Sequence, residues 1–301
     1  MRCVRVFVTG SGGFVGCHLV ARLQAIGHQV TATDREVDVS DASALEPAVR
    51  RAAPALIVHL AAISSVPESR NEPDLTYRVN FLGTRCLLET AQREAPDARI
   101  LLIGSADTYG SSEPGAKAFA EDAPLRPGSP YARTKAAADL LGAEYAAKGL
   151  DVVRARPFNH AGPGQSDAFV LSSFARQAAL IALSQIQPQL RVGNLDSVRD
   201  FLDVDDVIDA YLALSDPKVP SDVYNVASGR GVRIGDALDE ILAIAGVKPE
   251  IEIDPERFRP TDHAVGNADR LRSATGWKPR TPLSRTLERL VQDWRERLSA
   301  T

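Results

Sequence analysis

Short hydrophobic runs rich in β-branched residues alternate, along the first half of the chain, with longer segments of helical periodicity. Strands are expected at residues 4–8, 29–33, 55–60, 100–103 and 152–155. Repeated strand–helix units place the strands parallel to one another and cover both faces of the sheet with helices. The pattern therefore predicts an α/β fold built on a Rossmann-type, doubly wound parallel sheet.

A glycine-rich turn, Thr9-Gly10-Ser11-Gly12-Gly13-Phe14-Val15-Gly16, follows the first expected strand. Gly10 permits the tight turn, Gly13 lets the backbone approach a diphosphate, and Gly16 lets the helix pack on the sheet. Asp34 ends the second strand and is placed to bind the adenosine ribose, which favours NAD by charge. The adjacent Arg35 could instead pair with a 2′-phosphate. The turn predicts NADP(H) or NAD(H) as cofactor, with the choice between them open.

The order of elements changes after Pro157. A Gly- and Pro-rich loop over 159–165 precedes expected helices near 169–182 and 204–214, and expected strands near 190–192 and 223–226. We therefore expect a dinucleotide-binding domain of residues 1–158, to which 203–226 returns, and a smaller, discontinuous C-terminal α/β substrate domain of residues 159–301. Only three residues separate Asp34 from Asp38, too few for a crossover helix, so the third strand should be short or missing.

Composition excludes several partners. A net charge of -4 over 301 residues gives no basic field for nucleic acid. We find no apolar run of the roughly 18 residues that would suggest a membrane span. Cys3, Cys17 and Cys86 show no paired spacing, so we interpret them as reduced residues of the core and expect neither a disulfide framework nor a metal site. These features predict a soluble cytoplasmic protein.

Three residues could form a proton-transfer set. Tyr131 and Lys135 are four residues apart on an expected helix and share one face of it. Ser105 follows the strand at 100–103 and reaches the carboxyl edge of the sheet, where ligands bind in this kind of fold. A carbonyl oxygen held between the Ser105 and Tyr131 hydroxyls would be polarised and then protonated, and Lys135 is expected to lower the pKa of the tyrosine. Asp107 is either an acid or base near the substrate or a cap for the following turn.

The motifs together resemble the extended short-chain dehydrogenase/reductase family that acts on nucleotide sugars. The resemblance spans the whole chain and rests on residues 9–16, 59–62, Asn80, 105–110, the Tyr131/Lys135 pair and 156–159. It implies that Ser105, Tyr131 and Lys135 are catalytic. The residues that it and the glycine turn assign to the cofactor are Gly10, Gly13, Phe14, Val15, Gly16, Asp34, Arg35, Asp38, Val39, Leu60, Ala61, Ala62, Asn80, Tyr131, Lys135 and Pro157.

Residues 159–165 and 192–201 look most like the branch of that family that uses GDP-linked 6-deoxyhexoses. The resemblance assigns six residues to the substrate: Ser64, Asp107, Asn159, Arg199, Arg259 and Asp262. Arginine suits phosphate oxygens because its planar fork can donate two parallel hydrogen bonds. The implied reaction is hydride transfer from NAD(P)H to the C4 keto group of GDP-6-deoxy-4-keto-D-mannose, giving GDP-D-rhamnose or its C4 epimer.

Three other functions stay open. A nucleotide-sugar 4-epimerase could use the same Ser, Tyr and Lys. A GDP-mannose 4,6-dehydratase needs a further carboxylate, typically a Glu where this chain has the shorter Asp107. An NAD(P)-sensing binding protein would not need the complete catalytic set, which argues against it. The family resemblance also implies a homodimer in which the helices at 74–92 and 131–145 form a four-helix bundle.

Overall fold

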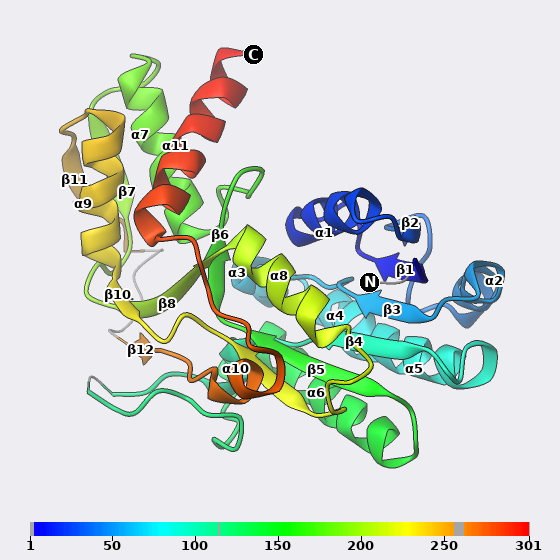
Figure 1. Cartoon of the computed structure of the whole chain (residues 1–301). Helices are drawn as coiled ribbons and strands as arrows, with labels where there is room; N and C mark the ends of the chain where they lie inside the picture. The colour runs from blue at the N-terminus through cyan, green and yellow to red at the C-terminus, as the bar shows by residue number, and fades with distance from the viewer. Residues whose placement is uncertain (1–2, 114, 256–261, 301) are drawn as a thin grey trace.

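A computed structural model describes residues 3–113, 115–255 and 262–300. Within these residues, the main sheet has six parallel strands in the order β2-β1-β3-β4-β5-β9. They are β1 (Arg5–Thr9), β2 (Gln29–Thr33), β3 (Leu56–His59), β4 (Arg99–Ile103), β5 (Val152–Pro157) and β9 (Val223–Val226). The predicted parallel α/β sheet is confirmed (Figure 1).

Helices cover both faces of this sheet (Figure 1). One face carries α1 (Phe14–Ala25), α8 (Val204–Leu214) and α10 (Asp269–Thr275). The other carries α2 (Ala42–Ala52), α5 (Gly83–Glu94) and α6 (Pro130–Ala147). All five residues of β4 are buried, because helices cover both faces of the sheet at this central parallel strand.

Short helical segments connect the strands on the side of α5 and α6. They are α3 (Val66–Asn71), α4 (Pro73–Tyr77), the π-helix η1 (Arg78–Leu82) and the 3₁₀-helix η2 (Ala106–Tyr109). The chain passes from β2 through α2 directly to β3, which lies on the other side of β1. The outer strand that the short 34–38 segment made doubtful is absent from the described sheet, so β2 forms its edge.

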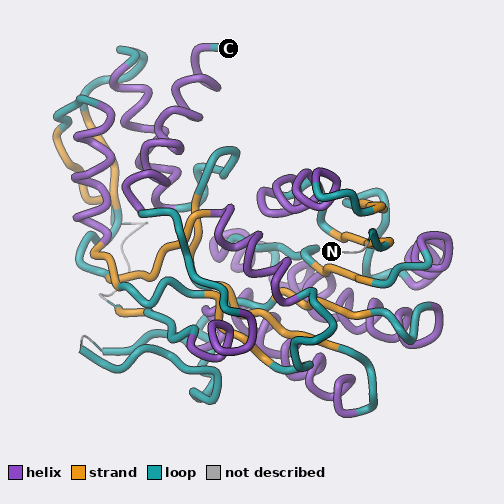
Figure 2. Tube along the Cα trace, in the orientation of Figure 1, coloured by secondary structure: helices purple, strands orange, loops and turns teal. Residues whose placement is uncertain are grey.

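A second region grows from the carboxyl side of the sheet. Its strands are β6 (Asn159–Ala161), β7 (Gln189–Val192), β8 (Val198–Asp203), β10 (Gly231–Arg233), β11 (Glu250–Ile253) and β12 (His263–Ala264). Its helices are α7 (Val170–Ala182), α9 (Ile234–Ala245) and α11 (Leu283–Ser299), which pack together around one apolar cluster (Figure 2). The segment at 159–165, expected to be all loop, begins with β6 because its backbone pairs with β8.

Buried carboxylates hold the crossings between the two regions. Asp200 accepts the backbone N–H groups of Ser228 (2.9 Å), Gly229 (2.9 Å) and Gly266 (3.2 Å). Asp203 caps α8 and accepts the Thr286 hydroxyl at 2.8 Å. An aspartate in such a place satisfies several backbone donors that burial would otherwise leave unpaired.

Two of the three free cysteines lie at the surface. Of the three free cysteines only Cys86 is buried; Cys3 and Cys17 are exposed, so the assignment of all three to the core was wrong. Cys3 precedes β1, and Cys17 lies on the exposed side of α1, so neither side chain is covered by the core.

In the described part of the chain, no helix is both long and apolar enough to cross a bilayer. The cytoplasmic location stays a prediction.

Candidate active site

The glycine turn brings the end of β1 against the loop after β3. Gly10 has a φ of +70°, and a Cβ there would lie 2.6 Å from the Ala61 nitrogen. A Cβ on Gly16 would lie 2.2 Å from the Gly10 oxygen. Both positions therefore exclude side chains on steric grounds, and Gly10 also needs the left-handed backbone conformation that favours glycine. The turn thus places Leu60 and Ala61 beside the start of α1.

Gly13 has a different reason to be glycine. A Cβ on Gly13 would have Gly10 O as its nearest neighbour, at an ordinary 3.4 Å. Gly13 is also the N-cap of α1, and its missing side chain leaves the first helical N–H groups without a side-chain partner. Open space above an uncapped helix N-terminus fits an anionic diphosphate. The turn, with Phe14 and Val15 beginning the helix, therefore fits the dinucleotide that the sequence predicts.

The residues expected around the adenosine lie in the loop after β2. Asp34 lies over Gly12, where a Cβ would come within 2.5 Å of Asp34 Oδ2, and Arg35 is exposed. Asp38 accepts the Ser40 N–H at 2.9 Å and the Ser40 hydroxyl at 2.7 Å. These bonds, with a smaller contribution from Arg78, lower the pKa of Asp38. Asp38 thus shapes this loop through its carboxylate.

Val39 and Pro157 complete the cofactor assignments at opposite ends of the site. Val39 is buried against Gly83, where a Cβ would come within 2.7 Å of the Val39 Cγ2. Pro157 is buried at the end of β5, at the carboxyl edge of the sheet. Both positions agree with a cofactor extended along this edge, and direct contact with it stays a prediction.

Helix α6 presents the Tyr and Lys of the expected set. Ser129 caps it by accepting the Ala132 N–H at 3.1 Å, and Pro130 occupies the first helical position, where proline is favoured. The Tyr131 N–H is bound by Ser69 Oγ at 3.2 Å. Lys135 is buried, and its Nζ donates to the Ile103 carbonyl at 2.8 Å, at the end of β4. The cap and these two contacts fix the helix against the sheet edge.

The pKa of Tyr131 lies above the usual value for tyrosine, whereas the sequence led us to expect a lowered one. Burial, and then the Asp107 charge, raise the pKa of the Tyr131 phenol, while a side-chain hydrogen bond with Ser105 acts in the opposite direction. Burial also lowers the pKa of Lys135 from 10.5 to about 8. The low-dielectric surroundings disfavour both phenolate and ammonium, so Tyr131 holds its proton firmly.

Ser105 and Asp107 lie in the turn after β4. Ser105 is buried and caps η2, its hydroxyl accepting the Asp107 N–H at 3.1 Å. The capping side chain of this turn is therefore Ser105 and not Asp107, and a role of Asp107 near the substrate stays a prediction. Although the Asp107 side chain reaches solvent, the protein around it raises the pKa of its carboxyl by desolvation. Arg199 lowers that pKa and Asp262 raises it, so Asp107 lies within electrostatic reach of both.

Asn80 connects the cofactor loop to the catalytic helix. It is buried in the π-helix η1, a rare element that often marks functional sites. Its Oδ1 accepts the Ile63 N–H at 2.8 Å, and its Nδ2 donates to the Ile63 carbonyl and to Thr134 Oγ1, both at 3.0 Å. Both amide hydrogens are thus used within the protein. Asn80 positions the loop that contains Ala61 and Ala62, next to the helical turn of Lys135.

His59 extends this connection to the glycine turn, a role that sequence reasoning missed. The Ala61 N–H donates to Thr9 Oγ1 (3.3 Å), and the Thr84 hydroxyl donates to the Asn80 carbonyl (2.7 Å). The Thr9 hydroxyl can then donate to His59 Nδ1 (2.8 Å), and His59 Nε2–H to Thr84 Oγ1 (3.2 Å). This assigns a neutral His59 with its hydrogen on Nε2.

The pKa of His59 agrees with that assignment. Burial, with the Lys135 charge as a second cause, lowers it to about 3. A neutral imidazole can be both donor and acceptor, as the two threonines require. The sequence carried one signal for this role, a histidine at the end of an otherwise apolar expected strand, with no obvious ligand nearby.

Two expected substrate residues meet in the second region. Arg199 Nη2 lies 2.6 Å from Asp262 Oδ1 and donates to Asp262 Oδ2 at 2.7 Å. Both side chains are only partly exposed. The pair brings together β8 and the segment just before β12, and Asp107 lies within its electrostatic reach. Arg259, which is also assigned to the substrate, lies outside the described residues.

Of the two remaining substrate assignments, one lies at the start of β6 and the other in the loop after β3. Asn159 opens this strand, and His160 follows with Nδ1 3.0 Å from the Phe158 carbonyl. The His160 ring stacks on Phe14 at 6.1 Å, so the start of α1 contacts the second region. Ser64 is exposed in the loop between β3 and α3. No contact among the described residues tests these assignments, which stay predictions.

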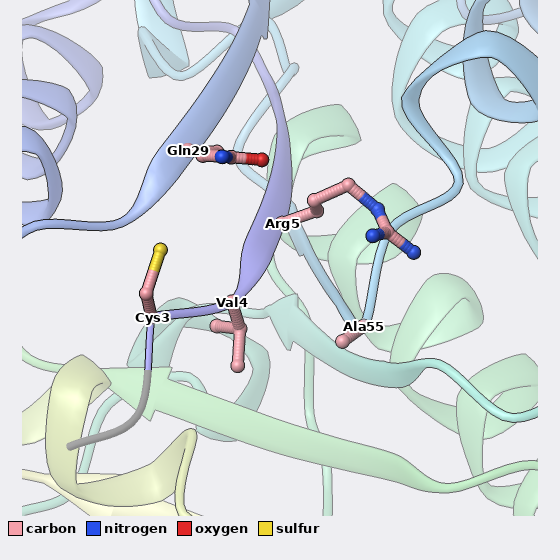
Figure 3. A pocket seen from close by; sticks show the side chains of 5 residues that line it. All are labelled: Cys3, Val4, Arg5, Gln29 and Ala55. Carbon is pink, nitrogen blue, oxygen red and sulfur yellow. The ribbon is translucent and has the colours of Figure 1, made fainter.

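A surface hollow lies far from these residues. Figure 3 shows Cys3, Val4, Arg5, Gln29 and Ala55 around it. They precede or begin β1, β2 and β3, so the hollow lies at the amino edge of the sheet. Ligands of doubly wound sheets bind at the opposite, carboxyl edge, where Ser105 and Lys135 lie. We therefore assign the chemistry to the carboxyl edge.

Comparisons with known proteins agree with this geometry. The GDP-mannose 4,6 dehydratase family matches residues 35–290. The chain is 38% identical over 300 residues to GDP-6-deoxy-D-mannose reductase of Pseudomonas aeruginosa, covering 98% of each protein. A structure of RMD from Pseudomonas aeruginosa complexed with NADPH superposes with a TM-score of 0.90, at 37% identity over 98% of this chain and 99% of that one.

A second structural relative is the UDP-glucose 4-epimerase of Thermus thermophilus in complex with NAD. It has a TM-score of 0.87 and 30% identity, and the match covers 97% of this chain and 99% of that one. The fold, the glycine turn and the Ser, Tyr and Lys set all agree with NAD(P)-dependent chemistry on nucleotide sugars. The chain belongs to the GDP-mannose 4,6 dehydratase family of extended short-chain dehydrogenase/reductases.

Proposed function

We propose that this protein reduces the C4 keto group of GDP-6-deoxy-4-keto-D-mannose, with NAD(P)H as the hydride donor. The product is GDP-D-rhamnose or its C4 epimer. The observation that carries the proposal is the placement of the Tyr131 phenol close to Ser105 and one helical turn from Lys135, with its pKa raised by burial and by the Asp107 charge. A reductase needs an acid at this position, because the alkoxide formed by hydride addition must take up a proton.

Each residue of the catalytic set has a separate role in the proposed reduction. NAD(P)H, when bound, supplies the hydride that adds to the C4 carbon. Ser105 orients the carbonyl oxygen, and Tyr131 gives its phenolic proton to that oxygen. The buried Lys135 ammonium then stabilises the phenolate that remains on Tyr131, because an opposite charge favours the ionised phenol. Proton transfer thus runs from Tyr131 to the sugar oxygen.

Substrate binding falls to the second region. Arg199, whose Nη2 already contacts both carboxylate oxygens of Asp262, could donate hydrogen bonds to diphosphate oxygens. Asp262 would then face the ribose hydroxyls. The relative that is 38% identical is named for a GDP-linked 6-deoxyhexose, which supports the same substrate class here.

Asp107 argues for reduction over dehydration. A 4,6-dehydratase must also remove the C5 proton and expel the C6 hydroxyl, which needs a carboxyl that reaches the far side of the sugar. Asp107 is one methylene shorter than the glutamate typical of dehydratases. A charge at Asp107 also favours protonated Tyr131, whereas a dehydratase begins with that tyrosine as a base.

We also propose that the protein is a homodimer through α6 and the α4–α5 segment. The outer face of α6 carries Arg133, Ala137, Leu140 and Glu144, with Leu140 61% exposed. A two-fold axis between Ala137 and Leu140 would place each Arg133 opposite the partner's Glu144. Such a face is self-complementary, as a symmetric dimer requires. Size-exclusion chromatography with light scattering tests this, with a Leu140→Glu variant expected to be monomeric and Leu183→Glu as an exposed-leucine control.

The test of the reaction is direct. Purified protein is mixed with freshly made GDP-6-deoxy-4-keto-D-mannose, or with the dTDP-linked 4-keto-6-deoxyglucose, and loss of NADPH or NADH absorbance is followed. Rapid oxidation with the GDP sugar alone is expected, and NMR of the product gives its C4 configuration. No oxidation with either sugar, combined with interconversion of UDP-glucose and UDP-galactose, would replace reduction by epimerisation.

A further inference from the structure

Arg156 is buried between the two segments that carry the catalytic hydroxyls. It lies on β5 and is 4% exposed. Its Nε and Nη2 donate to the two oxygens of Asp139, at 3.2 and 2.6 Å. Its Nη1 donates to the Tyr109 hydroxyl at 2.8 Å and to the Glu121 carbonyl at 3.1 Å. The guanidinium therefore donates hydrogen bonds to residues in three separate segments of the chain.

Tyr109 is the contact of Arg156 on the Ser105 side. It ends the 3₁₀-helix that Ser105 caps, and it is 1% exposed. Its hydroxyl accepts from Arg156 and donates to Asn225 Oδ1 at 2.7 Å. The ring stacks on Phe119 at 5.1 Å, with the Arg156 guanidinium also 5.1 Å from its centre. The 3₁₀-helix η2 is thus held at the end opposite its Ser105 cap.

Asp139 is the contact on the Tyr131 side. It lies on α6 four residues after Lys135 and eight after Tyr131, so all three share one face of the helix. Its carboxylate is 1% exposed and also accepts from Arg154 at 3.3 Å. The Asp139–Arg156 pair therefore fixes both the rotation of α6 and its height above β5.

We propose that Arg156, Tyr109 and Asp139 are positioning residues that set the position of the Ser105 hydroxyl relative to the Tyr131 phenol. None of the three is placed to touch the substrate. Arg156 holds, from one strand, the turn that presents Ser105 and the helix that presents Tyr131. A buried ion pair of this kind specifies an arrangement more than it adds stability. The inference rests on the proposed function only through the reaction used as readout.

The main test removes one oxygen atom from this network. Tyr109→Phe keeps the stacked ring and deletes the hydroxyl between Arg156 and Asn225. The control is Tyr224→Phe, which deletes the hydroxyl of another buried tyrosine, one that donates to the Pro220 carbonyl at 2.9 Å. Tyr109→Phe loses two hydrogen bonds and Tyr224→Phe one, so both should lose thermal stability, Tyr109→Phe somewhat more.

Only Tyr109→Phe should lose turnover. We expect its kcat to fall about 10- to 100-fold, because small misplacements of catalytic groups cost that much. The KM for the sugar and the affinity for NADPH, from fluorescence titration, should stay near wild type. Tyr224→Phe should keep its kcat. Arg156→Lys, which keeps the charge but cannot bind Asp139 with two donors and Tyr109 at once, should lose more and shift the pH profile of kcat.

The outcomes separate this inference from the proposed reduction. If wild type does not reduce the GDP sugar, the comparison is made on UDP-glucose epimerisation, which uses the same Ser105 and Tyr131. A crystal structure of Tyr109→Phe gives a readout that needs no substrate, and a distance between Ser105 Oγ and Tyr131 Oη longer than in wild type is expected. Wild-type kcat in Tyr109→Phe, an equal loss of kcat in Tyr224→Phe, or an unchanged Ser105–Tyr131 distance in the crystal would each overturn the proposal.

Discussion

Replacing Gly13 by alanine should separate cofactor binding from folding. The added Cβ would meet no atom closer than the Gly10 oxygen at 3.4 Å, and the φ of -73° suits alanine. Alanine restricts the unfolded chain, which stabilises by about 0.4–1 kcal/mol. It is also a poorer N-cap than glycine, which costs a similar amount, about 0.5–1 kcal/mol. The two effects oppose each other, so the free energy of unfolding should stay close to the wild-type value.

Affinity for the cofactor should fall all the same. The methyl group would occupy the space through which a diphosphate approaches the first N–H groups of α1. We expect the Kd for NADPH to rise at least tenfold, which corresponds to about 1.4 kcal/mol. Fluorescence titration of NADPH gives the Kd, and urea unfolding without cofactor gives the stability.

Gly16→Ala is the contrasting variant. Its Cβ would lie 2.2 Å from the Gly10 oxygen and 2.7 Å from the Ser11 oxygen, so the backbone must shift. This variant should lose about 1–3 kcal/mol of stability even without cofactor. Unchanged NADPH affinity in Gly13→Ala would refute the placement of the diphosphate. A large loss of stability in that variant would refute the claim that its Cβ has room.

Three further predictions concern the chemistry of the site. Tyr131→Phe should lower kcat by about 10²- to 10⁴-fold in the NADPH oxidation assay, with NADPH affinity retained. Because burial lowers the folded-state pKa of Lys135 to about 8, below the usual 10.5, wild type should gain stability as pH rises above about 8. Urea unfolding should show a gain of roughly 2 kcal/mol from about pH 8 to about pH 10 that Lys135→Met lacks; parallel curves would contradict it. Arg199→Ala should raise the KM for the GDP sugar at least tenfold, the loss of a charged hydrogen bond being worth about 1.5–3 kcal/mol, and an unchanged KM would remove Arg199 from the substrate site.

The sequence was informative wherever local pattern and packing agree. The strand at 29–33 and the helix at 204–214 match β2 and α8 to the residue, and Val30 of β2 and the buried apolar residues of α8 pack on the sheet core. The helix expected at 131–145 begins one residue earlier, at Pro130, after the Ser129 cap. The family resemblance assigned both Arg199 and Asp262 to the substrate, but their pairing could not be deduced from spacing, since they are 63 positions apart.

Long-range polar contacts were beyond such reasoning. His59 and Thr84 form hydrogen bonds whose partners lie on other strands and helices. Asp139 carried one usable signal, an acid one turn beyond Lys135 on the same helix face, but its partner on β5 is set only by the tertiary fold. The expected lowering of the Tyr131 pKa was wrong for a related reason. Burial raises this pKa, and burial depends on packing that no motif describes.

The edge position of β2 has a consequence for how cofactor preference can change. Three of its five residues are exposed, and no described strand lies beyond it. The loop that carries Asp34 and Arg35 therefore borders solvent, where substitutions usually shift stability by less than about 0.5 kcal/mol. Exchange between the two dinucleotides can thus proceed by altering charges in this loop, step by step, while the buried strands and the catalytic helix keep their packing. The enzyme's choice of reducing agent is in this sense separable from its chemistry, and laboratory evolution could alter one without the other.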